Sequence, residues 1–215
     1  MKIAEVKVNY SSSKIFRFKI ALQGIEPEIW REIDVPEIYN FWELHVAIQD
    51  AMGWLDCHLH EFVPHKSGPT KGAHIGIPGF DENENIIAGW ELPIKKYFSV
   101  VGNSIQYDYD FGDGWQHQVT LIGIFLEPMM TTYPVCYAGE GACPPEDCGG
   151  IHGYQNLLDI LSDPENDEYE EMVEWLKGHA KKYWPYKADK FSVKRVKFSD
   201  LYQRWCIAFD QPYDG

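Results

Sequence analysis

The sequence lacks several features that would assign it to a familiar class. It has no run of about eighteen apolar residues, so no segment is long and apolar enough to cross a membrane as a helix. Its first residues alternate charged and apolar side chains and lack the apolar core of a signal peptide. We therefore expect a cytoplasmic protein.

Motifs for common catalytic and nucleotide-binding sites are also missing. Gly139-Glu-Gly141 has no third glycine at the spacing of a dinucleotide-binding loop, and no phosphate-binding lysine motif occurs. There is no Gly-x-Ser-x-Gly elbow of the kind that presents a nucleophilic serine. The sequence thus excludes the usual nucleotide-binding loops and the serine-hydrolase elbow.

Basic residues are scarce and unevenly placed. Lys and Arg number 19 against 33 Asp and Glu, a net charge of −14 that argues against a nucleic-acid coat protein. Nine of the basic residues lie between Lys177 and Arg204, interleaved with aromatic residues. This segment could contact phosphates through Lys194, Arg195 and Lys197 and stack on bases. It could equally be a solvated, amphipathic segment that covers the acidic rest of the protein, or one that binds an acidic partner.

The five cysteines are an odd number, so intramolecular disulfides cannot use all of them. Three lie in one loop at Cys136, Cys143 and Cys148. Six residues separate Cys136 from Cys143 and four separate Cys143 from Cys148, so only the second interval reaches the upper limit of the two to four of a zinc knuckle. Two interpretations stay open: a structural zinc site completed by a histidine, or buried thiols in a Gly- and Pro-rich loop.

What the sequence does contain predicts a globular α+β protein. The 215 residues are 45% apolar and 15% aromatic, enough to bury a core. Apolar and polar side chains alternate over residues 15–22 and 29–35, which predicts the two strands of a hairpin. Asn40 and Glu43 form a capping box, and Gly53 ends the helix they begin.

The best strand pair covers residues 104–111 and 115–125. A three-residue loop would pair Phe111 with Trp115 and Tyr109 with His117, which keeps the apolar side chains on one face. His117 should then lie on the inner face, while Asp108 and Asp110 face outward.

The remaining segments complete an α+β order. Residues 54–63 predict a strand with His58, His60 and Phe62 on one face. After it we expect a long irregular loop over 64–90 with one short strand near Ile75-Gly-Ile77, and a short helical or turn segment over 91–101. Helices are expected over 153–161, from Asp163 to Gly178, and after a Ser199 cap, with residues 191–198 extended. The expected fold is a mainly antiparallel sheet from the N-terminal two-thirds, with the early amphipathic helix and the C-terminal helices packed on it.

Several motifs occur together and in order along the chain. They are Ile29-Trp-Arg31, Leu44-His45, Gly53-Trp54, His58-Leu-His-Glu-Phe62, Tyr109-Asp-Phe-Gly-Asp113, Trp115, His117, Tyr133-Pro134, Ala142-Cys-Pro-Pro-Glu-Asp-Cys-Gly-Gly150, Asp163-Pro164 and Trp175-Leu176. With them the chain resembles, over about residues 14–200, the plasmid open-reading-frame-three-like family first named from an Ri plasmid. That family includes passenger proteins of bacterial insertion elements.

The resemblance implies one α+β domain over residues 1–215 and no particular activity. It favours His117 as the fourth ligand beside the three cysteines, since the family motif includes His117 and leaves the position of His152 open. Some passenger members carry a resolvase-like label, which this sequence does not support. A serine resolvase needs a nucleophilic Ser among arginines, and Ser11 to Ser13 lie in a polar leader without them.

Two other groups could carry chemistry. His58 and His60 have the spacing that presents two imidazoles from one strand face, although such pairs are also ordinary packing residues. Asp113, Glu146 and Asp147, with Asp108 and Asp110, could form a carboxylate cluster for a divalent ion or for acid–base work. The opposing interpretation assigns Asp113 to a turn, Asp108 and Asp110 to a solvated sheet face, and Glu146 and Asp147 to capping or bracing the loop.

We therefore expect a non-catalytic cytoplasmic binding or accessory protein of plasmids or mobile elements, with a structural zinc as one option. The first alternative is a metal-dependent, hydrolase-like enzyme that uses His58, His60 and His117. The second is a nucleic-acid-binding accessory protein that uses the basic segment.

Overall fold

A computed structural model describes residues 14–213 except 66–69, 71, 80–84 and 127–130. The polar leader with Ser11 to Ser13 lies outside the described residues. Within them the chain forms eight strands: β1 (Lys14–Leu22), β2 (Ile29–Pro36), β3 (His60–Val63), β4 (His74–Gly76), β5 (Ile86–Ala88), β6 (Ser104–Tyr109), β7 (Trp115–Leu126) and β8 (Val135–Glu140). The helices are α1 (Phe41–Met52), α2 (Gly150–Ser162), α3 (Tyr169–Gly178) and α4 (Leu201–Ala208), with 3-10 turns η1 (Gly89–Glu91), η2 (Ile94–Lys96) and η3 (Val193–Arg195).

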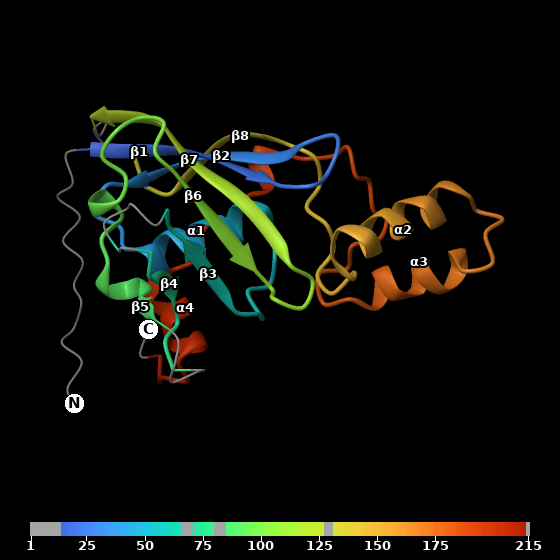
Figure 1. The fold of residues 1–215 in the computed structure, drawn as a ribbon. Coiled ribbons are helices and arrows are strands. Elements are labelled where there is room, and N and C mark those ends of the chain that lie inside the picture. Colours follow the sequence, from blue (N-terminus) through green and yellow to red (C-terminus); the bar gives the residue numbers. More distant parts are fainter. Residues whose placement is uncertain (1–13, 66–69, 71, 80–84, 127–130, 214–215) are drawn as a thin grey trace.

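The strands form one sheet in the order β5-β4-β3-β6-β7-β1-β2-β8 (Figure 1). Neighbours are antiparallel except β4 and β5, which are parallel. The predicted α+β class with a mainly antiparallel sheet is confirmed. So is the hairpin of the first two strands, which pairs Leu22 with Ile29.

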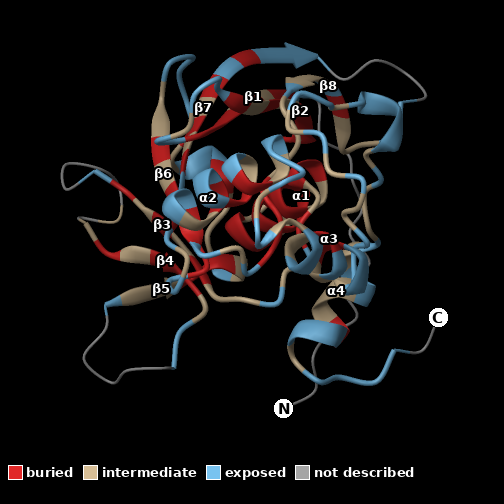
Figure 2. Ribbon diagram, turned by 90° about the vertical axis from the view of Figure 1, so that its right-hand side faces the viewer, coloured by how far each residue is buried: buried red, intermediate tan, exposed pale blue. Residues whose placement is uncertain are grey.

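Helix α1 covers one face of the sheet, and burial runs along most of its length (Figure 2). Its predicted ends are confirmed. Asn40 and Glu43 form the capping box, and Gly53 has the left-handed φ of 99° that ends the helix. The core between α1 and the sheet is dominated by aromatic and branched side chains, among them Phe18, Ile20, Phe41, Leu44, Ile48, Ile105 and Val119.

The C-terminal helices pack in two different places. Helices α2 and α3 pack on each other as a pair beyond the end of the sheet (Figure 1). Helix α4 packs against α1, where the rings of Trp42 and Trp205 meet edge to face at 5.7 Å.

The predicted register of the β6–β7 hairpin is wrong by two residues. Tyr109 pairs with Trp115 and Tyr107 with His117. The turn begins at Asp110, whose backbone has φ 56° and whose carboxylate accepts hydrogen bonds from the amides of Gly112 and Asp113. An even-numbered shift leaves the side-chain faces unchanged, so His117 is still buried on the inner face.

Two further expectations about this hairpin are corrected. Phe111, predicted to be in the strand core, is 56% exposed because it lies in the turn. Asp110, predicted to face solvent, is only 6% exposed because its carboxylate folds back on the loop.

Other element boundaries also differ. The strand expected over 54–63 begins only at His60, because Asp56 has φ 58° and interrupts extended backbone. Helix α3 begins at Tyr169 and not at Asp163. The side chains of Asp163 and Asn166 accept hydrogen bonds from the amides of Glu165 and Glu168, and these contacts form turns before the helix. Asp200, not Ser199, caps α4. Ser199 binds Asp50 instead.

Candidate functional site

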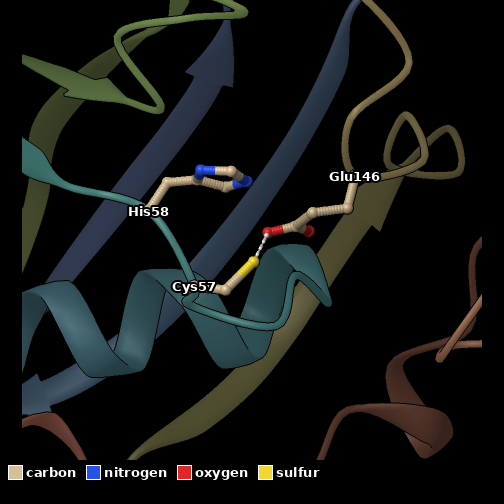
Figure 3. A group of neighbouring side chains, drawn as sticks. All are labelled: Cys57, His58 and Glu146. Carbon is tan, nitrogen blue, oxygen red and sulfur yellow. Dashed lines mark hydrogen bonds between the residues drawn. The ribbon is translucent and has the colours of Figure 1, made fainter.

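Three segments far apart in the sequence meet at His58. The imidazole Nε2 of His58 lies 3.0 Å from Oδ1 of Asp147 and 3.5 Å from Oδ2 of Asp110. Cys57 and Glu146 also lie beside His58 (Figure 3). The Cys57 sulfur, a Glu146 carboxylate oxygen and a His58 ring nitrogen are all within 4.8 Å of one another. We call His58, Cys57, Asp110, Glu146 and Asp147 the His58 cluster.

The β6–β7 turn positions Asp110. Its Oδ1 accepts hydrogen bonds from the Gly112 amide at 3.0 Å and the Asp113 amide at 3.3 Å, so this oxygen is held by the loop. Its Oδ2 is left to face His58. Asp tolerates the left-handed backbone that this turn needs, because its short side chain can bond locally to the backbone.

The loop after β8 is fastened to the same turn. Asp113 Oδ2 accepts a hydrogen bond of 3.1 Å from the amide of Gly149. Gly150 has φ 68°, and a Cβ there would overlap the carbonyl oxygen of Asp113. This close backbone approach places Asp147 beside His58. Asp113 therefore supports the cluster and does not face it.

Glu146 is the most buried member, with 1% of its surface exposed. Its Oε1 accepts a hydrogen bond of 3.5 Å from the Cys57 thiol (Figure 3). The same oxygen accepts one from the Tyr109 hydroxyl, and Oε2 accepts one from the Leu55 amide at 3.3 Å. Burial raises the pKa of Glu146 despite these donors. Burial, together with the adjacent Glu146, raises the pKa of Cys57 to about 11, so Cys57 is a thiol at neutral pH and a poor nucleophile.

The cluster has more negative than positive charge. Three carboxyl groups, those of Asp110, Glu146 and Asp147, surround one imidazole. Among the ion pairs of the described residues, no Lys or Arg reaches any of these three groups. His58 Nε2 is buried yet makes no aligned hydrogen bond to either Asp oxygen. The cluster is electrostatically suited to a cation.

The four residues expected to bind zinc are placed differently. In the described part of the chain, His/Cys/Asp/Glu ligand atoms converge in two groups, and both consist of members of the His58 cluster. Cys136 lies in β8 with its thiol directed to the carbonyl of Ala138, and Cys143 and Cys148 are partly exposed in the following loop. The five cysteines, all described, form no disulfide.

His117 and His60 have structural partners instead. His117 is fully buried, its Nδ1 lies 3.2 Å from the Tyr107 carbonyl, and desolvation lowers its pKa to about 4. The His60 ring stacks on His45 at 3.4 Å, and desolvation lowers the His60 pKa well below its usual value. The three histidines of the expected hydrolase site therefore do not gather: only His58 reaches the cluster.

Most aromatic residues of the basic segment pack on the protein, whereas most of its other residues face solvent. Phe191 lies under the guanidinium of buried Arg31 at 3.8 Å, and the Tyr186 hydroxyl donates to the Cys143 carbonyl at 3.1 Å. Arg204 pairs with Asp50 and Asp56. The candidates for phosphate contact, Lys194, Arg195 and Lys197, are exposed. The geometry thus favours the packed-cover interpretation for the aromatic residues.

Sequence reasoning missed Cys57 and Tyr109 as members or supports of the site, and it directed Asp110 away from it. One signal was available: Asp110-Phe-Gly is a typical Asx-turn sequence. No local signal could bring Cys57 next to Glu146, because 89 residues separate them.

The fold and site together define a class: an α+β protein in which a cysteine-containing loop closes a histidine–carboxylate cluster at the end of a hairpin. The chain belongs to the plasmid pRiA4b ORF-3-like protein family, which it matches over residues 14–195. The expected family membership is confirmed. No helix among the described residues has the length and apolar character needed to span a membrane.

Two relatives share most of the chain. The uncharacterized protein y4hQ of Sinorhizobium fredii (strain NBRC 101917 / NGR234) is 31% identical over 194 residues, which cover 90% of this chain and 95% of that protein. The crystal structure of MM3350, a protein of unknown function from Methanosarcina mazei Go1, is similar with a TM-score of 0.75 and 38% identity. That similarity covers 87% of this chain and 100% of that one.

Proposed function

We propose that this protein is a cytoplasmic accessory protein of plasmids or mobile elements that binds a divalent metal ion at His58, Asp110 and Asp147. The observation that carries the proposal is the arrangement at His58 Nε2, with carboxylate oxygens at 3.0 and 3.5 Å and no aligned hydrogen bond. An ordinary imidazole–carboxylate pair would align its N–H with one oxygen.

The spacing fits ligands around one ion. An ion about 2.1 Å from each ligand atom separates neighbouring ligands by about 3.0 Å in octahedral geometry and about 3.4 Å in tetrahedral geometry. One imidazole and two carboxylates suit Zn²⁺, Mn²⁺ or Fe²⁺. The Asp147 side chain is 59% exposed, so water or a ligand could complete the coordination.

Metal titration of protein purified without an affinity tag tests the proposal. After chelator treatment, calorimetry with Zn²⁺ and with Mn²⁺ should give one equivalent bound. His58→Ala and Asp147→Asn should weaken binding by about tenfold or more, a typical loss for residues at a metal site. The matched control is His74→Ala. It removes an imidazole that lies outside the cluster and whose Nδ1 is 2.7 Å from Oε2 of Glu61.

Cobalt distinguishes the ligand sets. Co²⁺ bound by His58, Asp110 and Asp147 should show no sulfur-to-metal charge-transfer absorption. Such absorption, lost in Cys143→Ser and Cys148→Ser and kept in His58→Ala, would favour the expected site of Cys136, Cys143, Cys148 and His117. Absence of binding by any of these ions would refute the proposal.

A cytoplasmic location is supported by the five unpaired thiols, because a reducing compartment preserves them. The proposal favours binding over covalent catalysis, since the thiol in the His58 cluster, that of Cys57, has a raised pKa. A metal-dependent enzyme built on His58, His60 and His117 gains no support from this geometry.

A further inference from the structure

A second candidate binding site lies between α2 and α3. A cavity of about 310 Å³ opens there, at the lower end of the range for small-ligand pockets. Its size suits a small organic molecule better than a dinucleotide or another large cofactor.

The walls of the cavity combine apolar and acidic groups. Leu157, Met172 and Trp175 give it an apolar and aromatic surface. Glu168 and Glu171 lie on the same wall as Trp175, and the lining contains no Lys or Arg. Among the described residues neither glutamate has an ion pair, whereas nearby Glu174 is paired with Lys177.

The helix dipole explains part of this charge but not the whole arrangement. Acidic residues are favoured in the first turn of α3, where Glu170 and Glu171 both lie. Only Glu171 of these two lines the cavity, together with Glu168 at the N-cap and Trp175 one turn further on. An aromatic face beside unpaired carboxylates is the combination that attracts organic cations, through cation–π and charge interactions.

We propose that the α2–α3 cavity binds a small organic cation, an alkylammonium or alkylguanidinium group with a short apolar body. The apolar body contacts Leu157, Met172 and Trp175, and the cationic group lies near Glu168 and Glu171. This site goes beyond the proposed metal site. Because Asp147 lines the cavity and also belongs to the His58 cluster, it is left unchanged in the test.

Ligand-observed NMR and calorimetry with butylguanidinium and butylammonium, in the presence of a chelator, test the inference. The wild-type protein should bind both cations at millimolar concentration and should bind neutral 1-pentanol and anionic butyrate more weakly. Glu168→Gln and Glu171→Gln should each weaken binding by about two- to fivefold, as expected for exposed charge pairs. Trp175→Leu should weaken it by about threefold.

The matched control is Glu170→Gln, which removes the same charge from the same helix turn outside the cavity and should keep wild-type affinity. A short peptide with one arginine, compared with butylguanidinium, distinguishes a peptide side chain from a free small molecule as the source of the cation. Equal binding of 1-pentanol, or equal losses in Glu170→Gln and Glu171→Gln, would overturn the inference, as would absence of cation binding. The chelator makes each result independent of the metal site.

Discussion

At the scale of single residues, Arg31 joins α1 to the β2–β8 edge of the sheet, and the ring of Phe191 from the basic segment lies on its guanidinium. Arg31 is 1% exposed, and its guanidinium donates to the carbonyls of Ala51, Trp30, Glu140 and Gly141. Lysine cannot reproduce this planar fork, so Arg31→Lys should lower the free energy of unfolding by about 2–4 kcal/mol.

Urea unfolding of Arg31→Lys and of a control variant measures this loss of stability. The control is Arg195→Lys, because Arg195 is exposed and should lose about 0.5 kcal/mol or less. Equal losses in the two variants would show that the buried carbonyl contacts contribute nothing specific.

His117 should make stability depend on pH. Its folded pKa, about 4, lies below the unfolded value near 6.5. Between these values the unfolded chain binds a proton that the folded chain does not, so stability falls as the pH decreases through this range and is unaffected by this group above about 6.5. The total effect is on the order of 3 kcal/mol.

His117→Gln should flatten the dependence of the unfolding free energy on pH between about 4 and 6.5. Exposed His152→Gln is the matched control and should leave the slope unchanged. In His117→Gln a dependence on pH of the same sign should remain, smaller than in the wild type, because the pKa of buried His60 is also lowered. A slope identical to wild type in His117→Gln would contradict the assignment.

At the scale of elements, the contact between the β6–β7 turn and the loop before α2 should control the proposed metal site. Gly150→Ala adds a methyl group where the backbone has φ 68° and where the Asp113 carbonyl leaves no space. We expect a loss of about 1–3 kcal/mol in stability and weaker metal binding, because Asp147 shifts away from His58. Gly178→Ala, with nothing within 4 Å of its added Cβ, should change neither quantity by a comparable amount. Unfolding and metal titrations of both variants provide the measurement.

The same elements show why sequence reasoning succeeded in some places and failed in others. The α1 ends and the β1–β2 hairpin were predictable because capping and alternation act over a few neighbouring residues. The β6–β7 register was missed because the Asp110 side chain bonds to its own turn. The candidate site was only partly anticipated: His58 was named in one group and Asp110, Glu146 and Asp147 in another. The meeting of these two groups depends on contacts between segments far apart in the chain.

At the scale of the whole molecule, metal binding should stabilise the fold, because the ion joins segments around residues 58, 110 and 147. A ligand that binds only the folded state adds about 2.7 kcal/mol at a hundredfold excess over its Kd. For a chain of this size, that corresponds to an increase in Tm of about 5–10 °C. Thermal unfolding with and without Zn²⁺ or Mn²⁺ measures it.

Two variants separate a specific effect from a general response to cations. His58→Ala should abolish the increase in Tm, because it removes the shared ligand of the cluster. The triple variant Lys194→Ala, Arg195→Ala, Lys197→Ala makes the net charge of −14 still more negative and should strengthen any nonspecific attraction of cations while keeping the specific increase unchanged. If the triple variant shows a larger increase and His58→Ala retains the wild-type one, the ion is attracted by overall charge and is not bound at His58.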